Sequence, residues 1–340
     1  MTINYTEIHG RLLETRASDP APGVLVTGDV WYNSTAEAVK YVGFSTGGWA
    51  TDGNFNTGRP GGAVMAGEAP ASIAVGTSPA PGSPLNQITE EYNGSAWSSQ
   101  NSLNTDRGRI SGTGTQTAFM VVSGGSLTGP YSQATEEYDG TNWTSVNNIP
   151  TGNVISGSSG LQTAAVRWGG YSTGGTRTDA SFEYDGTNWT SAPNYPQINF
   201  GAYGAGPQTA TVSISGGNIP PSPSYSNITA EYNGSSWSTN PATYPGDVSY
   251  TNWSGDDTDA LIFGGSGQPG SGTTDLISTW NGTTYSTSPL VTPVATRAQT
   301  GNKGSGSSNA FSYMVSPSPA TQTYDFTTSP FQSVKTVTTS

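Results

Sequence analysis

The sequence predicts an all-β protein built from repeated modules of short strands. Its 340 residues include 46 Gly and 23 Pro, which interrupt helices and favour turns. They also include 9 Trp, 17 Tyr and 9 Phe, more aromatic side chains than a disordered chain carries. A third observation is a short motif that returns at a nearly constant interval, which is typical of repeat architectures.

The repeated motif consists of an aromatic residue, an Asn-Gly or Asp-Gly pair and a second aromatic residue. Both dipeptides accept positive φ, so each copy predicts a tight hairpin between a strand carrying the first aromatic and a strand carrying the second. The fifth copy exchanges Tyr and Trp, and the sixth is truncated. Successive copies lie 46, 46, 48, 48 and 44 residues apart, and they begin at Tyr92, Tyr138, Tyr184, Tyr232, Trp280 and Tyr324.

A glycine pair recurs with the same period, each time after a short apolar run. Each unit is therefore predicted to contain two strands, the glycine pair, a variable loop, a third strand, the Asn/Asp-Gly turn and a fourth strand. Gly76-Thr77 and Ser316-Pro317 replace the pair in the first and last units, where we expect irregular modules. The pairs are Gly124-Gly125, Gly169-Gly170, Gly216-Gly217 and Gly264-Gly265, and Gln-Thr-Ala precedes three of them at Gln116, Gln162 and Gln208.

Such small four-stranded sheets need neighbours, because one sheet cannot bury both of its faces. Radial stacking with closure buries these faces and removes most exposed edges, which predicts a β-propeller with the repeated Tyr and Trp as apolar fill between antiparallel blades. The alternative, an open stack of sheets, leaves long edges exposed and requires terminal caps.

The ends of the chain suggest how the ring closes. Trp49 precedes Trp97 by 48 residues, while the chain after Tyr324 supplies only part of a unit. We therefore expect an N-terminal strand to complete the last blade of a six-bladed ring. Seven blades result if residues 23–52 form a blade with the tail Val334–Ser340. The predicted division is 1–22 as an anchoring segment, 23–53 as strands that contribute to closure, and 54–340 as the propeller.

These residues carry two resemblances. A glycine pair followed by an aromatic residue about 15 positions later, and by a second one five positions after that, resembles the kelch repeat of β-propellers over roughly 54–340. The stretches Gly28–Thr35 and Lys40–Gly43 resemble an element of bacteriophage virion proteins, especially those of marine cyanophages. This resemblance implies a virion structural protein of the tail or an appendage, assembled in the host cytoplasm as a homo-oligomer within the particle. Residues 1–22 would then contact other virion proteins, and a host surface glycan or receptor is a further expected partner.

Composition excludes several other functions. The net charge of −12 with only 11 Lys plus Arg argues against nucleic acid and anionic membrane surfaces as partners. The absence of Cys and the single His exclude disulfides, thiol nucleophiles and most His-based metal sites, so we expect no metal and no cofactor. Charges interrupt any signal-peptide core in the first twenty residues, and the apolar runs are too short to insert into a bilayer.

Two acidic features have competing interpretations. The pairs Glu90/Glu91 and Glu136/Glu137 could serve acid–base chemistry in a glycan hydrolase, but neighbours in a strand point to opposite faces, which favours a structural role such as a solvated strand edge. Asp256–Asp259 resembles the start of a calcium loop, but it lacks the glycine and distal glutamate of an EF-hand and favours an exposed turn. The sequence thus predicts a non-catalytic protein, with a glycan-binding protein or hydrolase acting on host polysaccharide as the alternative.

The variable loops after the glycine pairs are the candidate binding regions, because loops of a repeat array gather on one face. Tyr131, Tyr171 and Tyr225 lie in these loops. They could stack on sugars of a host glycan, or they could cover the backbone of their own loops.

Overall fold

The computed structural model describes most of the chain and contains no α-helix in the part described. The all-β prediction is therefore confirmed for those residues, and none of their elements is a helix long and apolar enough to cross a membrane. The described residues are 14–18, 30–45, 48–59, 63–68, 71–77, 87–125, 131–172, 174–214, 216–218, 224–266, 274–292, 309–313, 320–327 and 331–336.

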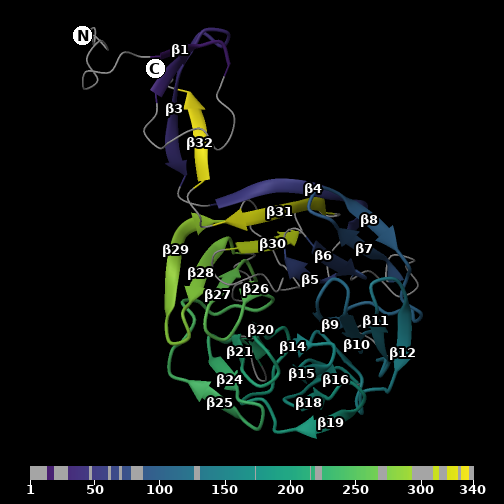
Figure 1. Cartoon of the computed structure of the whole chain (residues 1–340). Coiled ribbons are helices and arrows are strands. Elements are labelled where there is room, and N and C mark those ends of the chain that lie inside the picture. The colour runs from purple at the N-terminus through teal and green to yellow at the C-terminus, as the bar shows by residue number, and fades with distance from the viewer. Residues whose placement is uncertain are drawn as a thin grey trace. The chain divides into compact units, whose positions relative to one another are not determined.

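The chain forms two compact units, which are described separately. A terminal unit contains residues 1–48 and 327–340, and a repeat unit contains residues 49–326. The sheets of the repeat unit can be followed in order from β5 to β31 in Figure 1.

Five repeats each form a four-stranded antiparallel sheet, as the sequence predicts. A sixth sheet has three strands in the described part of the chain. The sheets are repeat 1, β5 (Val64–Glu68), β6 (Ala71–Val75), β7 (Thr89–Tyr92) and β8 (Trp97–Gln100); repeat 2, β9 (Ser111–Gly114), β10 (Phe119–Val122), β11 (Thr135–Tyr138) and β12 (Trp143–Val146); repeat 3, β14 (Gly157–Leu161), β15 (Ala164–Trp168), β18 (Ser181–Tyr184) and β19 (Trp189–Ala192); repeat 4, β20 (Tyr203–Ala205), β21 (Thr211–Ile214), β24 (Thr229–Tyr232) and β25 (Trp237–Asn240); repeat 5, β26 (Asn252–Gly255), β27 (Ala260–Phe263), β28 (Leu276–Trp280) and β29 (Tyr285–Val291); and repeat 6, β30 (Asn309–Tyr313), β31 (Ala320–Thr327) and β4 (Gly48–Arg59).

The Asn/Asp-Gly motif forms the predicted hairpin, but with a four-residue loop instead of a two-residue turn. Tyr138 pairs directly with Trp143, and Gly140 has a φ of 91°. The Asp139 carboxylate accepts hydrogen bonds from the backbone N–H groups of Thr141 and Asn142, at 2.8 and 2.7 Å. This Asx turn, not a type I′ turn, is the reason that Asn or Asp stands at this position.

The first strand of each repeat, which is the innermost strand of its sheet in Figure 1, contacts the first strand of the next repeat. The contacts run from β5 to β9, β14, β20, β26 and β30, and β30 contacts β5 again. Side chains join neighbours along this series: the Thr113 hydroxyl donates to Gly160 O, and the Ser159 hydroxyl donates to Gly206 O.

The sixth sheet joins strands from both ends of the repeat region. β4 pairs beside β31, as the position of Trp49 predicts, and Trp49 packs edge-on against Phe263 of repeat 5 at a centroid distance of 4.8 Å. On the other side, Trp97 of repeat 1 donates from its indole N–H to the Thr323 hydroxyl in β31 (3.4 Å). Tyr92 of repeat 1 also donates to the Asp52 carboxylate in β4.

The repeated tryptophans lie between neighbouring sheets, where the indole N–H is satisfied by the preceding repeat. Trp143 donates to the Thr89 hydroxyl (3.0 Å) and Trp189 to the Thr135 hydroxyl (2.9 Å). In repeat 5, where the aromatics are exchanged, the Tyr285 hydroxyl meets the Thr229 hydroxyl at 2.7 Å. The exchange thus preserves the polar contact, because either ring carries one polar atom at its edge.

The glutamines of the Gln-Thr-Ala motif also connect neighbouring sheets. The Gln162 amide donates two hydrogen bonds to repeat 2, to Phe119 O (3.1 Å) and to Tyr138 O (2.9 Å). Gln116 and Gln208 make the equivalent pairs with the repeats before them.

Replacing Gln162 by methionine should lower the free energy of unfolding by about 1–3 kcal/mol, since two carbonyl groups lose their donor. Urea denaturation would measure the change. The same substitution at Gln100, whose amide donates only to the neighbouring Ser98 hydroxyl, should alter stability by less than about 0.5 kcal/mol. Equal effects at the two sites would contradict a connecting role for Gln162.

The terminal unit contains its own four-stranded sheet. Its strands are β1 (Glu14–Arg16), β2 (Val30–Asn33), β3 (Ala38–Ser45) and β32 (Phe331–Thr336), with β1 parallel to β2 and the other pairs antiparallel. Residues from 23–52 do pair with the C-terminal tail, as the seven-bladed alternative requires, but the resulting sheet groups with the terminal unit. Most of the predicted anchoring segment 1–22 lies outside the described residues.

Candidate functional site

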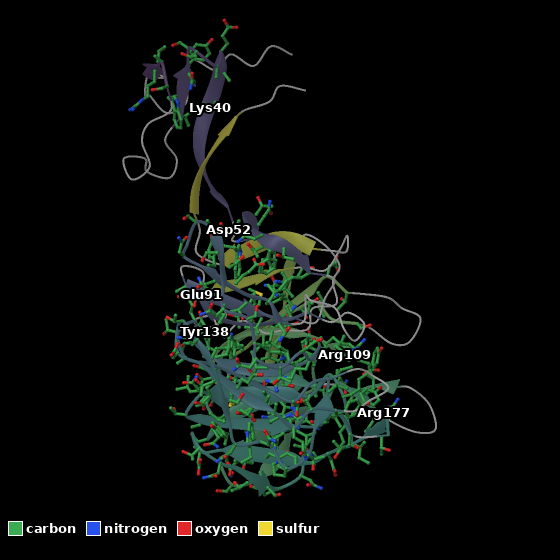
Figure 2. The ribbon with its side chains drawn as sticks, turned by 90° about the vertical axis from the view of Figure 1, so that its right-hand side faces the viewer. Lys40, Asp52, Glu91, Arg109, Tyr138 and Arg177 are labelled. Atoms are coloured by element: carbon green, nitrogen blue, oxygen red, sulfur yellow. The ribbon has the colours of Figure 1, made fainter. Side chains whose placement is uncertain are left out.

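One side of the repeat unit carries the described residues that flank the loops after the second strands, together with the residues that lead into the first strands. We call it the loop face. Its described loop and connecting residues include Arg109, Tyr131, Tyr171, Arg177, Phe200, Tyr225 and Tyr250. Figure 2 shows Arg109 and Arg177 on this side and Glu91 and Tyr138 on the opposite side.

The three candidate tyrosines do not occupy equivalent places. Tyr131 bridges Gly125, and Tyr225 pairs with Gly217 in the short sheet of β22 (Gly217–Asn218) and β23 (Ser224–Tyr225). In the third repeat the residue at the same place is Arg177, which pairs with Tyr171. Tyr171 itself stands where the neighbouring repeats have glycine.

A short sheet holds Tyr171 and Arg177 together. Its strands are β13 (Asn153–Val154), β16 (Tyr171–Ser172) and β17 (Thr176–Arg177). The Tyr171 ring packs on Phe200 at 4.8 Å, and the Arg177 guanidinium lies 5.8 Å from the Tyr171 centroid and 5.1 Å from that of Phe200. These cation–π contacts fix the orientation of the guanidinium plane.

Tyr131 is less accessible than a sugar-stacking residue would need to be, with 8% of its surface exposed. Burial raises the pKa of its hydroxyl, the nearby Tyr171 raises it further, and Arg109 lowers it. Tyr171 and Tyr225 are half-buried. The Tyr131 ring is therefore too covered to stack on a sugar, and only the pKa of its hydroxyl responds to Tyr171 and Arg109.

A second set of loop-face residues has left-handed backbone. Each of them lies two positions before the innermost strand of a repeat. Arg109, Ile155 and Tyr250 have φ values of 50°, 58° and 59°, and Gly201 occupies the same place in repeat 4. Their backbones are linked, because Gly201 N donates to Ile155 O (2.9 Å) and Tyr250 N donates to Gly201 O (3.0 Å). Non-glycine residues held in this conformation are frequent at functional positions.

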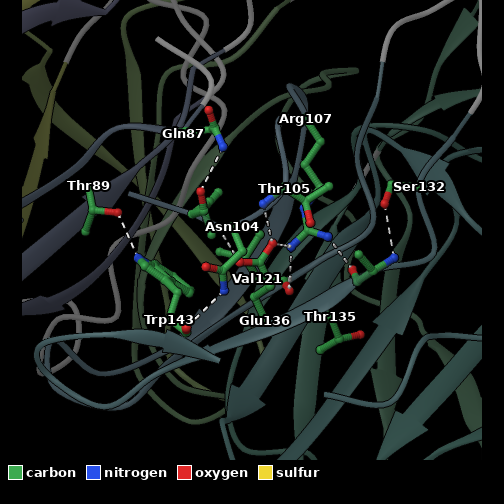
Figure 3. Close-up of polar contacts among 12 residues, drawn as sticks. Gln87, Thr89, Asn104, Thr105, Arg107, Val121, Ser132, Thr135, Glu136 and Trp143 are labelled. Carbon is green, nitrogen blue, oxygen red and sulfur yellow. Dashed lines mark hydrogen bonds and ion pairs between the residues drawn. The ribbon is translucent and has the colours of Figure 1, made fainter. Parts of the chain in front are cut away.

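The first glutamate of each Glu-Glu pair is buried, so the expected solvated strand edge is wrong for Glu90 and Glu136. Figure 3 shows Glu136 accepting from the backbone N–H groups of Asn104 (2.7 Å) and Thr105 (3.1 Å), with Arg107 Nη2 at 3.1 Å. Glu90 is bound in the same way by backbone N–H groups and by Arg59. Burial lowers the pKa of Arg107 to about 10, although Glu136 opposes this shift.

The second glutamate faces the other way and contacts the tyrosine of the next repeat. Tyr184 donates to Glu137 (2.8 Å), and Tyr232 donates to Glu183 (3.0 Å). Glu91 lies by Tyr138 in the corresponding place, and burial raises its pKa while the tyrosine lowers it. The two members of a pair thus point to opposite faces, as predicted, and in the second repeat Glu136 and Glu137 are engaged in separate structural contacts.

The acidic run Asp256–Asp259 forms a hairpin turn between β26 and β27. The Asp256 carboxylate accepts from the backbone N–H groups of Thr258 (2.8 Å) and Asp259 (2.9 Å) and from the Thr258 hydroxyl. These bonds and burial shift its pKa in opposite directions, with a net lowering. Among the described residues no group of three or more His, Cys, Asp or Glu side chains is arranged to hold a metal ion.

No family model matches the chain, and no curated protein matches it.

The sequence did not single out Arg109 or Arg177 as site residues. The only sequence signal for Arg177 is its position, since arginine there replaces a tyrosine of the adjacent repeats, and this becomes visible only through the pairing register.

Proposed function

We propose that the repeat unit is a closed, six-bladed, kelch-like β-propeller. Support comes from the cyclic order of contacts among the innermost strands, in which β30 touches both β26 and β5. The bonds from Trp97 to Thr323 and from Tyr92 to Asp52 further connect the first repeat to the sheet that contains β4 and β31. A strand from the N-terminal side in the last sheet is a common way for a ring of repeats to close.

We further propose that the protein is a non-catalytic component of a bacteriophage particle, in the tail or an appendage, with a role in assembly or host recognition. The non-catalytic role is supported by the ion pairs and hydrogen bonds that engage the glutamates recurring in the repeats. Each of those at Glu90, Glu136, Glu137 and Glu183 is bound by an arginine, by backbone N–H groups or by a tyrosine. A hydrolase needs two convergent carboxyl groups that are free to exchange protons.

The virion assignment rests on the resemblance of Gly28–Thr35 and Lys40–Gly43 to an element of phage virion proteins. The chain should be detected by mass spectrometry in purified particles of the phage that encodes it. An antibody against it should decorate the tail or an appendage in electron micrographs. Its presence in the lysate but not in washed particles would contradict the proposal.

The N-terminal segment is the proposed attachment to other virion proteins. Deleting residues 1–22 should leave the melting temperature of the repeat unit nearly unchanged and should remove the protein from assembled particles. Normal incorporation of the shortened chain would show that attachment occurs elsewhere.

A glycan-binding role is the second candidate, favoured by the aromatic and guanidinium groups on the loop face. Aromatic rings beside hydrogen-bonding side chains are suited to sugars, because a ring covers the apolar face of a pyranose while polar groups bind its hydroxyls. This role is compatible with a place on the virion surface.

A further inference from the structure

Two guanidinium groups on the loop face are distinct from the other described arginines of the repeat unit. Arg59 and Arg107 are buried and paired with glutamates, and Arg167 is enclosed within the sheets. Arg109 and Arg177 are only half-buried, and in the part of the chain that the structure describes neither forms an ion pair. In a protein of net charge −12, two such cations on the same side of consecutive repeats favour the approach of an anion to this part of the surface.

The position of Arg177 is restrained by its neighbours. Its guanidinium lies over the rings of Tyr171 and Phe200, and it is anchored in β17 directly opposite Tyr171. Its Nε is buried and has no hydrogen-bond partner among the described residues, so the two Nη groups are the donors that a ligand would meet. Contact with the two rings restrains the guanidinium group, and its Nη donors have the planar, forked arrangement that binds a carboxylate.

Tyr131 links Arg177's neighbour Tyr171 to Arg109. Tyr131 bridges Gly125, whose N–H donates to Gly108 O beside Arg109 (2.7 Å), and Gly124 N donates to Asn153 O (3.1 Å) in the strand that pairs with Tyr171. This backbone pairing brings the three residues into one neighbourhood that spans repeats 2 and 3, and the pKa of the Tyr131 hydroxyl responds to both Tyr171 and Arg109. Arg109 is held there by its left-handed backbone, with a φ of 50°. The neighbourhood therefore offers two cations, two phenolic hydroxyls and the edges of aromatic rings.

We propose that the loop face of repeats 2 and 3 binds a carboxylate-bearing saccharide, with Arg177 and Arg109 as the carboxylate ligands and the tyrosines as contacts to the sugar. A small inorganic anion would not use the rings, and a neutral sugar would not use two arginines that form no ion pair with any described residue. This inference rests on the proposed role in recognition, because the bound saccharide would be the surface feature that is recognised.

Calorimetry on the full chain would test the inference with tri-galacturonate as the probe. Its methyl ester, which keeps the sugar rings and removes the charges, is the matched control ligand. We expect the acid to bind, more weakly as salt is added, and the ester to bind at least tenfold more weakly. Binding of the ester as tight as that of the acid, or no binding of the acid at millimolar concentration, would overturn the proposal.

Single substitutions test which arginines bind the ligand. R177M and R109M should each weaken binding of the acid by about ten- to a hundredfold, since each removes a hydrogen-bonded charge. R177K keeps the charge but lacks the planar fork, so it should lose part of the affinity and also guard against a folding defect in R177M. R16M, which removes the same charge from the terminal unit, should bind as the native chain does. Unchanged binding by both loop-face methionine variants would contradict the site.

An acidic peptide is the competing ligand. Hexaglutamate should bind more weakly than tri-galacturonate, because it lacks the sugar rings. If the peptide binds as tightly, the saccharide assignment is wrong. Detection of the chain in virions does not depend on any of these results, so failure of this inference can be distinguished from failure of the proposed function.

Discussion

Replacing Arg107 by methionine is expected to lower the free energy of unfolding by about 3–5 kcal/mol, because it leaves a buried carboxylate without its counter-charge. Arg107 and Glu136 are 2% and 0% exposed. Arg107 Nη1 also donates to Ala134 O at 2.8 Å, so the substitution removes a donor from a carbonyl group as well. Equilibrium denaturation in urea would measure the loss as a lower midpoint with an unchanged slope.

The double variant R107M/E136Q separates the charge effect from the loss of packing. Without a charge on either residue, it should recover a large part of the stability that R107M loses. The chain itself supplies a precedent, since the fourth repeat has the uncharged residues Asn199 and Ala230 at these two places. A double variant no more stable than R107M would contradict the argument from the buried charge.

Replacing Arg167 by methionine should have the opposite effect on stability and raise the free energy of unfolding by about 1–4 kcal/mol. Arg167 lies in β15 and is 0% exposed, and its three guanidinium nitrogens have no hydrogen-bond partner among the described residues. Burial lowers its pKa to about 9, which still leaves the group charged near neutral pH. The desolvated charge therefore costs stability without a compensating bond.

The surroundings of Arg167 favour an apolar replacement. It pairs with Phe182 across the sheet, so the two side chains share a face. Phe182 packs there with Met120 and Val122 of the preceding repeat. Methionine has a similar length and no charge, and the same urea experiment would measure the gain. A loss of more than about 1 kcal/mol would contradict the prediction and would mean that the guanidinium has a partner in solution.

The repeat pattern was sufficient to predict the strands, because each strand is bounded by a local signal. The turn after Tyr138, the glycine pairs and the spacing of Trp49 predicted the hairpins, the loops and the strand that β4 contributes to the last sheet. These features depend on residues within a few positions, or on a constant period. The length of the hairpin loop could not be predicted, because Asn-Gly and Asp-Gly are common both in two-residue type I′ turns and in Asx turns.

The polar contacts between distant residues could not be predicted in the same way. Arg107 and Glu136 are 29 positions apart and meet only because the connection between repeats runs alongside β11. Strand alternation alone favoured an exposed glutamate as the structural role, since this residue is rarely buried without a partner and the partner is distant in the sequence. Arg177 was likewise overlooked, because its equivalence to Tyr131 and Tyr225 appears only when their pairing partners are known.

The proposed closed ring of six repeats is tested most directly by a pair of distances. The native chain has no cysteine, so spin labels can be placed at chosen residues without background. Ser95, Thr187 and Thr283 are exposed and follow the glycine of the same turn in repeats 1, 3 and 5. Double electron–electron resonance on the pairs S95C/T187C and S95C/T283C would measure both separations.

In a ring of six, repeat 1 is two steps from repeat 3 and also two steps from repeat 5. We therefore predict the same mean distance for the two pairs, within the widths of the distributions. In an open stack the second pair is four steps apart, and its distance would be about twice the first, since each added sheet contributes a similar spacing. A second distance close to twice the first would contradict the ring.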